Sequence, residues 1–406
     1  GVAAQVPKVD FASTMAHVKD VIAGIAPHDS QERFEGLGVT VIREAARFVD
    51  AETVEAGGNR IKARRFVVAT GSSPSAPPIP GLDCVDYFTN ETIFDNTTLP
   101  AHLIIIGGGP IGMEMAQAHR RLGAKVTVLE AFQPLGKDDP ELTAIVLAHL
   151  RDEGIDIRAG AKITGIAKAA RSKSIEITLQ GEDGKAEKLA GSHLLVAAGR
   201  VANVGGLNLE AAGIEYDRRG IKVDKGLRST NRKVYAIGDV AGGLQFTHVA
   251  GYQAGLVIRS ILFRLPVTNE TKIIPWVTYT DPELAHIGLT EAQAVESHPG
   301  HKVLRWHFAE NDRARAERRT SGLIKAVVSS KGEILGCSIV APNAGDLIQP
   351  WAMAISSGLK IKAMIDMVAA YPTFSEVSKR AATSYYADLP SRPMVRRIIG
   401  WLKIFG

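Results

Sequence analysis

Apolar residues recur along the chain with two different periods, and the period changes with position. In residues 10–26 the apolar positions lie three or four residues apart, which predicts an amphipathic helix. They are Phe11, Met15, Val18, Ile22 and Ile25. Residues 39–50 and 53–70 alternate apolar and polar positions as strands do, with Gly57-Gly58 as the predicted turn. Residues 71–81 are dense in Pro, Gly and Ser, which predicts an extended connection between domains.

The central part of the chain, residues 99–226, alternates strand-like and helix-like segments in the order β-α-β-α-β. Helices are predicted near 110–122 and 140–153. The predicted strands are 103–106, 125–130, 155–159, 163–166, 174–179 and 193–198. From about residue 268 strand-like segments return, interleaved with helical ones. The whole pattern predicts an α/β protein with more than one domain.

A glycine-rich turn, Gly107-x-Gly109-x-x-Gly112, follows an apolar strand and opens a predicted helix. Such a turn lets the backbone approach a pyrophosphate, and the helix N-terminus offers N–H groups to the anion. Glu130 ends the next strand, at the spacing expected of a carboxylate that binds a ribose 2′-hydroxyl. Only Lys137 follows nearby to compensate a 2′-phosphate, so NAD is favoured over NADP. The alternative reading is a glycine-rich surface turn.

Composition narrows the class of protein. The chain carries 48 basic and 43 acidic residues, and a net charge of +5 does not by itself indicate nucleic acid as a partner. The two cysteines, Cys84 and Cys337, are too far apart for a C-x-x-C pair and exclude a disulfide framework. They are predicted to be buried small residues, and a reducing cytoplasm is the expected compartment. The histidines show no H-x-x-x-H spacing, so no metal site is predicted.

Further motifs stand in a fixed order around the central unit: "VVATGSSP" (67–74), "VAAGRVAN" (196–203) and "VYAIGDVAG" (234–242). Together they resemble the pyridine nucleotide-disulfide oxidoreductases, the flavoprotein family of dihydrolipoamide dehydrogenase, glutathione reductase and mercuric reductase. The likeness continues through "TYTDPELAHIGLTE", "RARAERRTSGLIK" and "YPTFSE", so it covers nearly the whole chain.

The resemblance implies a Rossmann-like NAD domain inserted in an FAD domain, followed by an α+β dimerisation domain. The FAD domain would comprise residues 1–98 and 227–267, the NAD domain 99–226 and the dimerisation domain 268–406. FAD and NAD are the implied cofactors, and a homodimer is the implied assembly. The family's first G-x-G-x-x-G and its C-x-x-x-x-C redox pair do not occur in this sequence. The chain is therefore expected to start downstream of both.

Cofactor-binding residues are carried over from the family motif by motif. Asp239 would hydrogen-bond the ribityl chain of the flavin, although Gly238-Asp239 can also be read as a plain turn after a strand. Arg200 matches a "GRxPN" pattern that departs from the family at Val201-Ala202, and it can equally be a surface arginine. The remaining flavin and nucleotide residues implied by the resemblance are Thr70, Gly71, Gly199, Phe246 and Thr247.

Three residues are the candidates for catalysis. Glu114 matches a glutamate that pairs, in the family, with a lysine of the cysteine helix, which this sequence lacks. Tyr371 stands where disulfide reductases have the histidine that shuttles protons, and Glu376 matches that histidine's partner. A phenol with a pKa near ~10 is a poor proton shuttle at neutral pH. The alternative for Tyr371 is an aromatic packed at the dimer interface.

The predicted function is that of an NADH-dependent FAD oxidoreductase, which passes electrons from the flavin to a disulfide or another small-molecule acceptor. Two alternatives stay open. One is a non-catalytic NAD-binding dimeric remnant, and the other is a diaphorase bound to a membrane through residues 391–406. That segment is basic and amphipathic, and packing across a dimer is the favoured reading of it.

Overall fold

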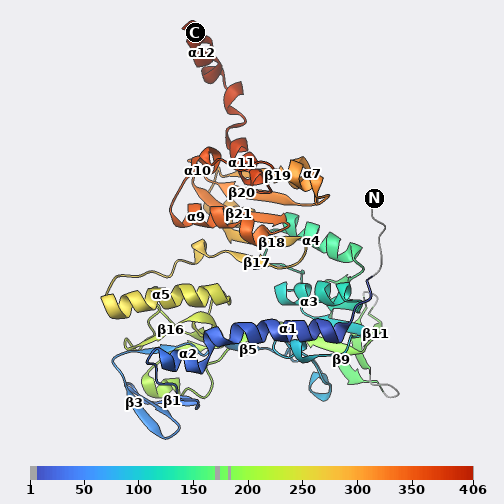
Figure 1. The fold of residues 1–406 in the computed structure, drawn as a ribbon, viewed down its shortest axis with the longest axis vertical. Helices are drawn as coiled ribbons and strands as arrows, with labels where there is room; N and C mark the ends of the chain where they lie inside the picture. The colour runs from blue at the N-terminus through green and yellow to red at the C-terminus, as the bar shows by residue number, and fades with distance from the viewer. Residues whose placement is uncertain (1–6, 170–173, 182–183, 406) are drawn as a thin grey trace. The chain divides into compact units, whose positions relative to one another are not determined.

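The computed structural model describes residues 7–169, 174–181 and 184–405 (Figure 1). The chain divides into two compact units. The first unit comprises residues 1–108, 118–131 and 157–271, and the second comprises 109–117, 132–156 and 272–406. Among the described residues, no helix combines the length and hydropathy needed to cross a membrane.

The first unit is built from short strands and a few helices. Its helices are α1 Phe11–Ile25, α2 Gln31–Gly36 and α5 Thr247–Phe263. Its strands are β1 Ala46–Asp50, β2 Thr53–Ala56, β3 Asn59–Lys62, β4 Phe66–Val68, β5 Ser72–Pro74, β6 His102–Ile106, β7 Lys125–Leu129, β9 Ile163–Lys168, β10 Ile175–Gln180, β11 Ala186–Gly191, β12 His193–Val196, β13 Arg200–Ala202, β14 Tyr216–Asp217, β15 Gly220–Ile221 and β16 Val234–Ala236. Helix α3 Pro110–Arg121 and strand β8 Asp156–Arg158 are shared with the second unit.

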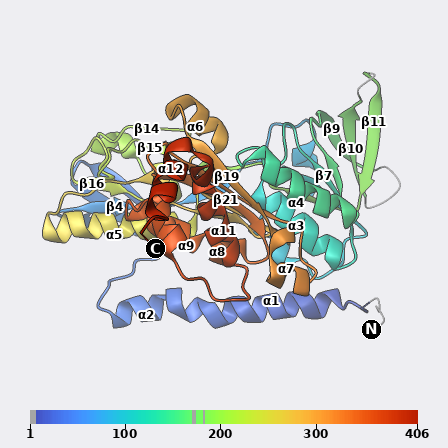
Figure 2. The same cartoon turned by 90° about the horizontal axis from the view of Figure 1, so that it is seen from above.

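One part of the first unit is a four-stranded sheet in the order β12-β6-β7-β8, parallel where β6 pairs with β12 and β7. Strand β6 is buried along its whole length, because it lies in the middle of the sheet and carries Leu103 and three isoleucines. An antiparallel sheet in the order β11-β10-β9 stands beside it in the same unit (Figure 2). Its strand β11 was not predicted, because 186–191 lacks an apolar alternation.

Another part of the first unit joins segments that are far apart in the sequence. Strand β4 pairs in parallel with β16, and β5 pairs with β13. Segment 71–81, predicted as a plain extended connection, therefore contributes a strand. Helix α5 packs on β16 through Leu256 and Val257, which contact Tyr235. The predicted turn at Gly57-Gly58 is confirmed, since it joins β2 to β3.

The second unit contains a five-stranded sheet in the order β17-β18-β21-β20-β19 and several helices (Figure 1). Its strands are β17 Trp276–Thr278, β18 Glu283–Gly288, β19 Lys302–His307, β20 Leu323–Val328 and β21 Ile334–Ala341. Its helices are α4 Pro140–Asp152, α6 Glu291–Ser297, α7 Asp312–Ala316, α8 Ala344–Leu347, α9 Gln349–Ser356, α10 Ile361–Asp366, α11 Glu376–Thr383 and α12 Pro393–Leu402. The indole of Trp351 is fully buried and donates to Ser378 Oγ at 3.0 Å, so it joins α9 to α11.

A buried ammonium lies within the second unit. Lys325 Nζ, on β20, contacts Asp139 Oδ2 at 2.7 Å, Glu141 Oε2 at 2.9 Å and Glu291 Oε2 at 2.6 Å. Its side chain is only 5% exposed, and that of Asp139 is 4% exposed. Burial alone would lower the pKa of Lys325, but hydrogen bonds to the three carboxylates raise it overall. Arg305 also pairs with Glu141 and Glu291, so the cluster attaches α4 and α6 to the sheet.

The two cysteines differ in environment. Cys337 lies in the core of the second unit, and its burial raises the pKa of the thiol. The prediction that it is a buried small residue is confirmed. The same prediction is wrong for Cys84, which ends a short 3₁₀ turn at Leu82–Cys84 and is exposed, with its thiol 3.6 Å from Asp83 Oδ1.

His286 on β18 is buried and neutral. Its ring lies 4.4 Å from that of Trp276, with Nδ1 2.6 Å from Ser338 Oγ and Nε2 3.0 Å from the Gly288 carbonyl oxygen. Burial lowers its pKa from 6.5 to about 4. Between these two pH values the unfolded chain binds more protons than the folded one. We expect the free energy of unfolding of the second unit to fall by about 2 kcal/mol between about pH 7 and about pH 5.

Thermal unfolding at the two pH values measures this effect. His286→Gln should lose most of the pH dependence above the range in which carboxylates titrate. His307→Gln, at an exposed position of the same unit, should retain it. Equal pH dependence in His286→Gln and the unmodified protein would remove His286 as the cause.

Candidate functional site

The glycine turn after β6 has the geometry of a phosphate-binding turn. Gly107 has φ +112°, and a Cβ there would lie 2.4 Å from the Ala197 carbonyl oxygen, so no larger residue fits. A Cβ at Gly109 would meet no described atom within 4 Å, which leaves room for a ligand to approach the backbone. Gly112 lies in the first turn of α3, which begins at Pro110, a residue suited to a helix start.

Glu130 follows β7 and is held against this turn. The N–H of Gly108 donates to Glu130 Oε2 at 2.6 Å, and the N–H of Glu130 donates to the Arg158 carbonyl oxygen at 2.9 Å. The carboxylate therefore lies at the carboxyl end of β7, beside the turn. In a Rossmann-like unit this is the position from which an acidic side chain contacts a ribose hydroxyl.

A second group of predicted residues meets in the first unit, where β5 pairs with β13. Ser72 Oγ donates to Asp239 Oδ2 at 2.5 Å and accepts from Arg200 Nε at 2.7 Å. Arg200 also donates from Nη2 to the Ser72 carbonyl oxygen at 2.6 Å and from Nη1 to Asn90 Oδ1 at 3.1 Å. Arg200 Nε lies 3.8 Å from Asp239 Oδ2, with both side chains 21% exposed. The reading of Arg200 as a plain surface arginine is therefore wrong.

The backbone on either side of this cluster is fixed by reciprocal contacts. Thr70 Oγ1 donates to the Asn203 carbonyl oxygen at 2.7 Å, and Asn203 Nδ2 donates to the Thr70 carbonyl oxygen at 3.0 Å. Gly71 follows with φ +68°. The N–H of Gly238 donates to Gln253 Oε1 at 2.7 Å, which fixes the turn that carries Asp239. Gly199, with φ +131°, accepts from the Ser75 N–H at 2.9 Å.

Phe246 and Thr247 lie at the start of α5, downstream of Asp239. Thr247 is the first residue of the helix, and Phe246 is its extended N-cap. The Phe246 ring is stacked on that of His248, with the centroids 5.3 Å apart and the planes 11° from parallel. The turn that carries the Asp239 carboxylate is therefore followed closely by two features, the Phe246 ring and the N-terminus of α5.

The Ser72–Arg200–Asp239 cluster fits the polar chain of a flavin cofactor. Asp239 is partly exposed, and a carboxylate has several acceptor positions, of which Ser72 uses one. A hydroxylated ribityl chain supplies the donors that such a carboxylate accepts. Arg200 and Ser72 hold the carboxylate in place, so it is oriented before a ligand arrives.

Glu114 on α3 lies in the second unit and accepts a hydrogen bond from the backbone. The N–H of Tyr279 donates to Glu114 Oε1 at 2.9 Å. Burial raises the pKa of Glu114, and this single hydrogen bond offsets only part of the rise. A backbone N–H is a neutral donor and a weaker partner for a carboxylate than a charged one.

Tyr371 is exposed at 71%, and its hydroxyl donates to Asp312 Oδ2 at 3.2 Å. The hydrogen bond to Asp312, with further repulsion from Asp312 and Glu376, raises the pKa of the phenol above its usual value. The phenol therefore stays protonated at neutral pH. Glu376 begins α11, close enough to repel the phenolate but without the hydrogen bond that its family counterpart makes to histidine.

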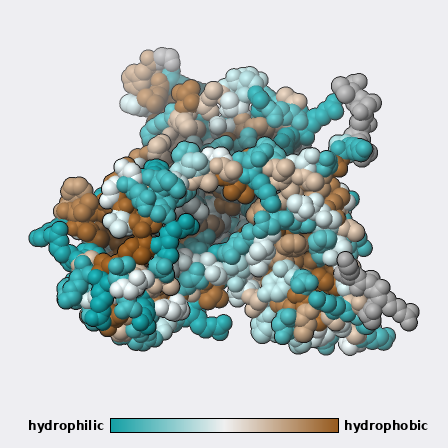
Figure 3. Space-filling view, turned by 60° about the horizontal axis from the view of Figure 1, so that its bottom comes forward, coloured by the Kyte–Doolittle hydropathy of each residue, from teal (hydrophilic) through white to brown (hydrophobic). Residues whose placement is uncertain are grey.

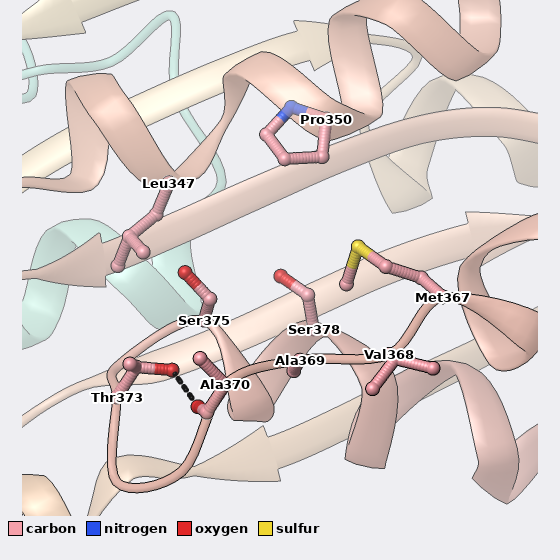
Figure 4. A pocket seen from close by; sticks show the side chains of 9 residues that line it. All are labelled: Leu347, Pro350, Met367, Val368, Ala369, Ala370, Thr373, Ser375 and Ser378. Carbon is pink, nitrogen blue, oxygen red and sulfur yellow. Dashed lines mark hydrogen bonds between the residues drawn. The ribbon is translucent and has the colours of Figure 1, made fainter.

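A cavity of about 240 Å³ opens beside this segment in the second unit (Figure 4). Its polar lining consists of hydroxyls, and Thr373 Oγ1 is already used in a 2.6 Å bond to the Ala370 carbonyl oxygen. The lining residues are Leu347, Pro350, Met367, Val368, Ala369, Ala370, Thr373, Ser375 and Ser378. The lining contains no acid or base, so the cavity by itself offers no catalytic group.

Two residues of these clusters were not predicted from the sequence. Ser72 follows the Thr70-Gly71 motif directly, and only the contact with Asp239, 167 positions away, gives it a role. Asp312 directly precedes the charged "RARAERR" run, and only its contact with Tyr371 gives it a role. No short-range pattern distinguishes either residue from an ordinary loop residue.

Comparison with known protein families shows which family the chain belongs to. The family model "Pyridine nucleotide-disulphide oxidoreductase" matches residues 11–254, and its "dimerisation domain" model matches residues 274–382. The chain belongs to the pyridine nucleotide-disulphide oxidoreductases. The predicted fold, an NAD domain inserted in an FAD domain and followed by a dimerisation domain, is confirmed at the level of this family.

Among its relatives, the chain is 35% identical to a mercuric reductase of Bacillus cereus over 384 residues, which cover 94% of the chain and 60% of that protein. It is 33% identical to a dihydrolipoyl dehydrogenase of Chlorobaculum parvum, covering 84% of the chain and 72% of that protein. The chain thus spans less than two thirds of the Bacillus cereus relative. The structure of the HOCl-induced flavoprotein disulfide reductase RclA from Escherichia coli matches with a TM-score of 0.83 and 29% identity, covering 92% of this chain and 86% of that one.

Proposed function

We propose that the protein is an NADH-dependent FAD oxidoreductase that passes electrons to a disulfide or another small-molecule acceptor. The Ser72–Arg200–Asp239 cluster carries the proposal, because three segments of the first unit converge there on one oriented carboxylate. When bound, the flavin would accept a hydride from the nicotinamide and supply the electrons for the acceptor.

The residues of the chain would bind and orient the two cofactors. The Gly107–Gly112 turn and the first turn of α3 would hold the pyrophosphate of the nicotinamide cofactor. Glu130 would accept from the ribose 2′-hydroxyl and repel a 2′-phosphate. Asp239 would hold the ribityl chain, with Phe246 and Thr247 along the flavin. Thr70, Gly71 and Gly199 would keep the strand ends in place.

Proton handling near Tyr371 would differ from that of ordinary disulfide reductases. The raised pKa of Tyr371 keeps its hydroxyl protonated, so it can donate a hydrogen bond but cannot act as a base near neutral pH. Glu114, whose carboxyl has a raised pKa, would contribute a weakly acidic group on α3. We therefore favour an acceptor that needs a hydrogen-bond donor at Tyr371 over one that needs a histidine shuttle.

Intact mass, an absorption spectrum and NADH oxidation with a dye acceptor test the proposal on one sample of purified protein. We expect a flavin band and a kcat/KM for NADH at least about tenfold above that for NADPH, since one charge repulsion of about 1.4 kcal/mol gives that factor. Glu130→Ala should reduce the preference for NADH and leave the flavin band unchanged. Glu187→Ala, at an exposed position of the same unit, should change neither.

The opposite outcome has a defined meaning. A sample with neither a flavin band nor NADH oxidation, but with NADH binding detected by fluorescence, would identify a non-catalytic NAD-binding protein instead.

The match to the dimerisation domain supports a homodimer as the assembly. We retain the four-segment domain division at residues 98, 226 and 267, and the cytoplasm as compartment, as parts of the same proposal.

A further inference from the structure

Helix α12 Pro393–Leu402 and the residues after it carry an apolar face that nothing in the described chain covers. No residue of this helix is buried. Trp401 is 60% exposed and Phe405 is 71% exposed, with their rings 4.9 Å apart. The exposed apolar side chains of this segment are Met394, Ile398, Ile399, Trp401, Leu402, Ile404 and Phe405. Figure 3 shows hydrophobic side chains gathered at this end of the chain.

The charges of the segment have a single sign. Residues 389–406 contain Arg392, Arg396, Arg397 and Lys403 and no acidic residue. At 100° per residue Arg396, Arg397 and Lys403 fall on one side of the helix. Ile398 and Leu402 fall on the other, and Phe405 follows the end of the helix. An apolar face opposite a purely basic face, with Trp and Phe among the apolar residues, is the arrangement of helices that lie in a membrane interface.

The segment lies outside residues 274–382, which match the dimerisation domain, so the matched dimer interface does not account for its apolar face. Packing against a second copy would also leave the basic face of each helix without an acidic partner in this segment. An anionic lipid surface offers both partners that the helix needs, namely negative headgroups and an apolar layer beneath them.

We propose that residues 392–405 bind the protein peripherally to a membrane surface rich in anionic lipid. The ten residues of α12 are about half the ~20 needed to span a bilayer, so the helix lies in the interface with Ile398 and Leu402 inserted. Phe405, whose ring contacts that of Trp401, adds an aromatic side chain just after the helix. Arg396, Arg397 and Lys403 contact the headgroups. The attachment is independent of the redox activity proposed above, so either can fail without the other.

Flotation with lipid vesicles tests this. The purified protein should bind vesicles of phosphatidylcholine with about 30% phosphatidylglycerol at least about tenfold better than vesicles of phosphatidylcholine alone. Raising the salt from about 0.1 M to about 1 M should weaken the binding, because it screens the headgroup charges. Binding should shift the tryptophan emission to shorter wavelength, and Trp401→Phe should remove that shift.

Two sets of variants test whether the basic residues of this segment, and not the charge of the whole protein, cause the binding to vesicles. Reversing the charges by Arg396→Glu, Arg397→Glu and Lys403→Glu together should lower binding to the anionic vesicles by about tenfold or more. The matched control reverses the exposed Lys8, Arg218 and Lys331 instead, and it should bind as the unmodified protein does. Light scattering should give one and the same mass for all of these proteins.

Three results would overturn the proposal. The first is no preference for anionic vesicles, and the second is unchanged binding by the charge-reversed variant. The third is a smaller mass for the charge-reversed variant than for the control, which would identify a second copy of the chain as the occupant of the apolar face.

Discussion

Asp239→Ala should purify without its flavin, or lose it on dilution, while its first unit stays folded. The side chain is held by Ser72 and lies near Arg200, so its position is fixed before a ligand binds. Removing a charged hydrogen-bond acceptor costs about 1.5–3 kcal/mol, which corresponds to a roughly 10- to 100-fold weaker binding of FAD. The ratio of flavin to protein absorbance and a titration of the apoprotein with FAD measure the effect.

Asp239→Asn and a control variant separate binding from folding. Asparagine keeps the shape of the side chain and one acceptor oxygen, so it should retain more flavin than alanine does. Asp83→Ala, the same change at an exposed position of the same unit, should retain all of it. The assignment of Asp239 would have to be abandoned if Asp239→Ala bound FAD with unchanged affinity and the same thermal midpoint.

Lys325→Met should destabilise the second unit by about 3–5 kcal/mol, because it leaves the buried carboxylate of Asp139 without its cation. Glu141 and Glu291 keep Arg305, whereas no contact between Arg305 and Asp139 compensates for the loss. Thermal unfolding, together with hydrogen exchange of the β20 amides, measures the change. Lys222→Met removes the cation of an exposed pair, 3.7 Å from Glu215, and should cost less than about 1 kcal/mol.

The second change at the same site tests the reason for the loss. In Lys325→Met/Asp139→Leu no buried charge remains unpaired, so a large part of the stability should return. A double variant as unstable as Lys325→Met alone would show that packing, and not the unpaired carboxylate, decides the loss.

The ion pair between Glu291 and Lys325 also makes the stability of the second unit depend on pH. The pKa of Glu291 is lowered, chiefly by its hydrogen bond to Lys325. The stabilisation by this pair is therefore present above about pH 4.5 and is lost as the pH falls through the folded pKa.

The sequence predicted the elements whose signal is local. The helix of residues 11–25, the turn at Gly57-Gly58 and the strand-glycine-helix unit around Gly107 are all present, because periodicity and turn chemistry act over a few residues. Strand β11 was missed because its sequence, "AEKLAG", lacks apolar alternation and forms only by pairing with β10. Its structure is dictated by a neighbour and not by its own residues.

For the candidate site, too, the sequence predicted what is local and missed what depends on distant segments. Motifs placed Asp239, Arg200 and Glu130 as candidates, but not the contacts that orient them. Ser72 meets Asp239 across 167 positions, and Tyr371 meets Asp312 across 59. Such pairs depend on the strand pairings β5–β13 and β4–β16 and on the loop at 371–376, which no local pattern reports.

The residues of the Ser72–Arg200–Asp239 cluster are far apart in the sequence, and this fixes the order in which they become available during synthesis of the chain. Arg200 is made 128 residues after Ser72, and Asp239 is made 167 residues after it. At roughly 5–20 residues per second, Asp239 emerges from the ribosome about 8–33 s after Ser72. Strand β5 must therefore wait without its partner β13 while residues 75–199, which include the glycine turn after β6, are translated. With the roles proposed above, the nascent chain can hold the ribityl chain of a flavin only after the Gly107–Gly112 turn has been made.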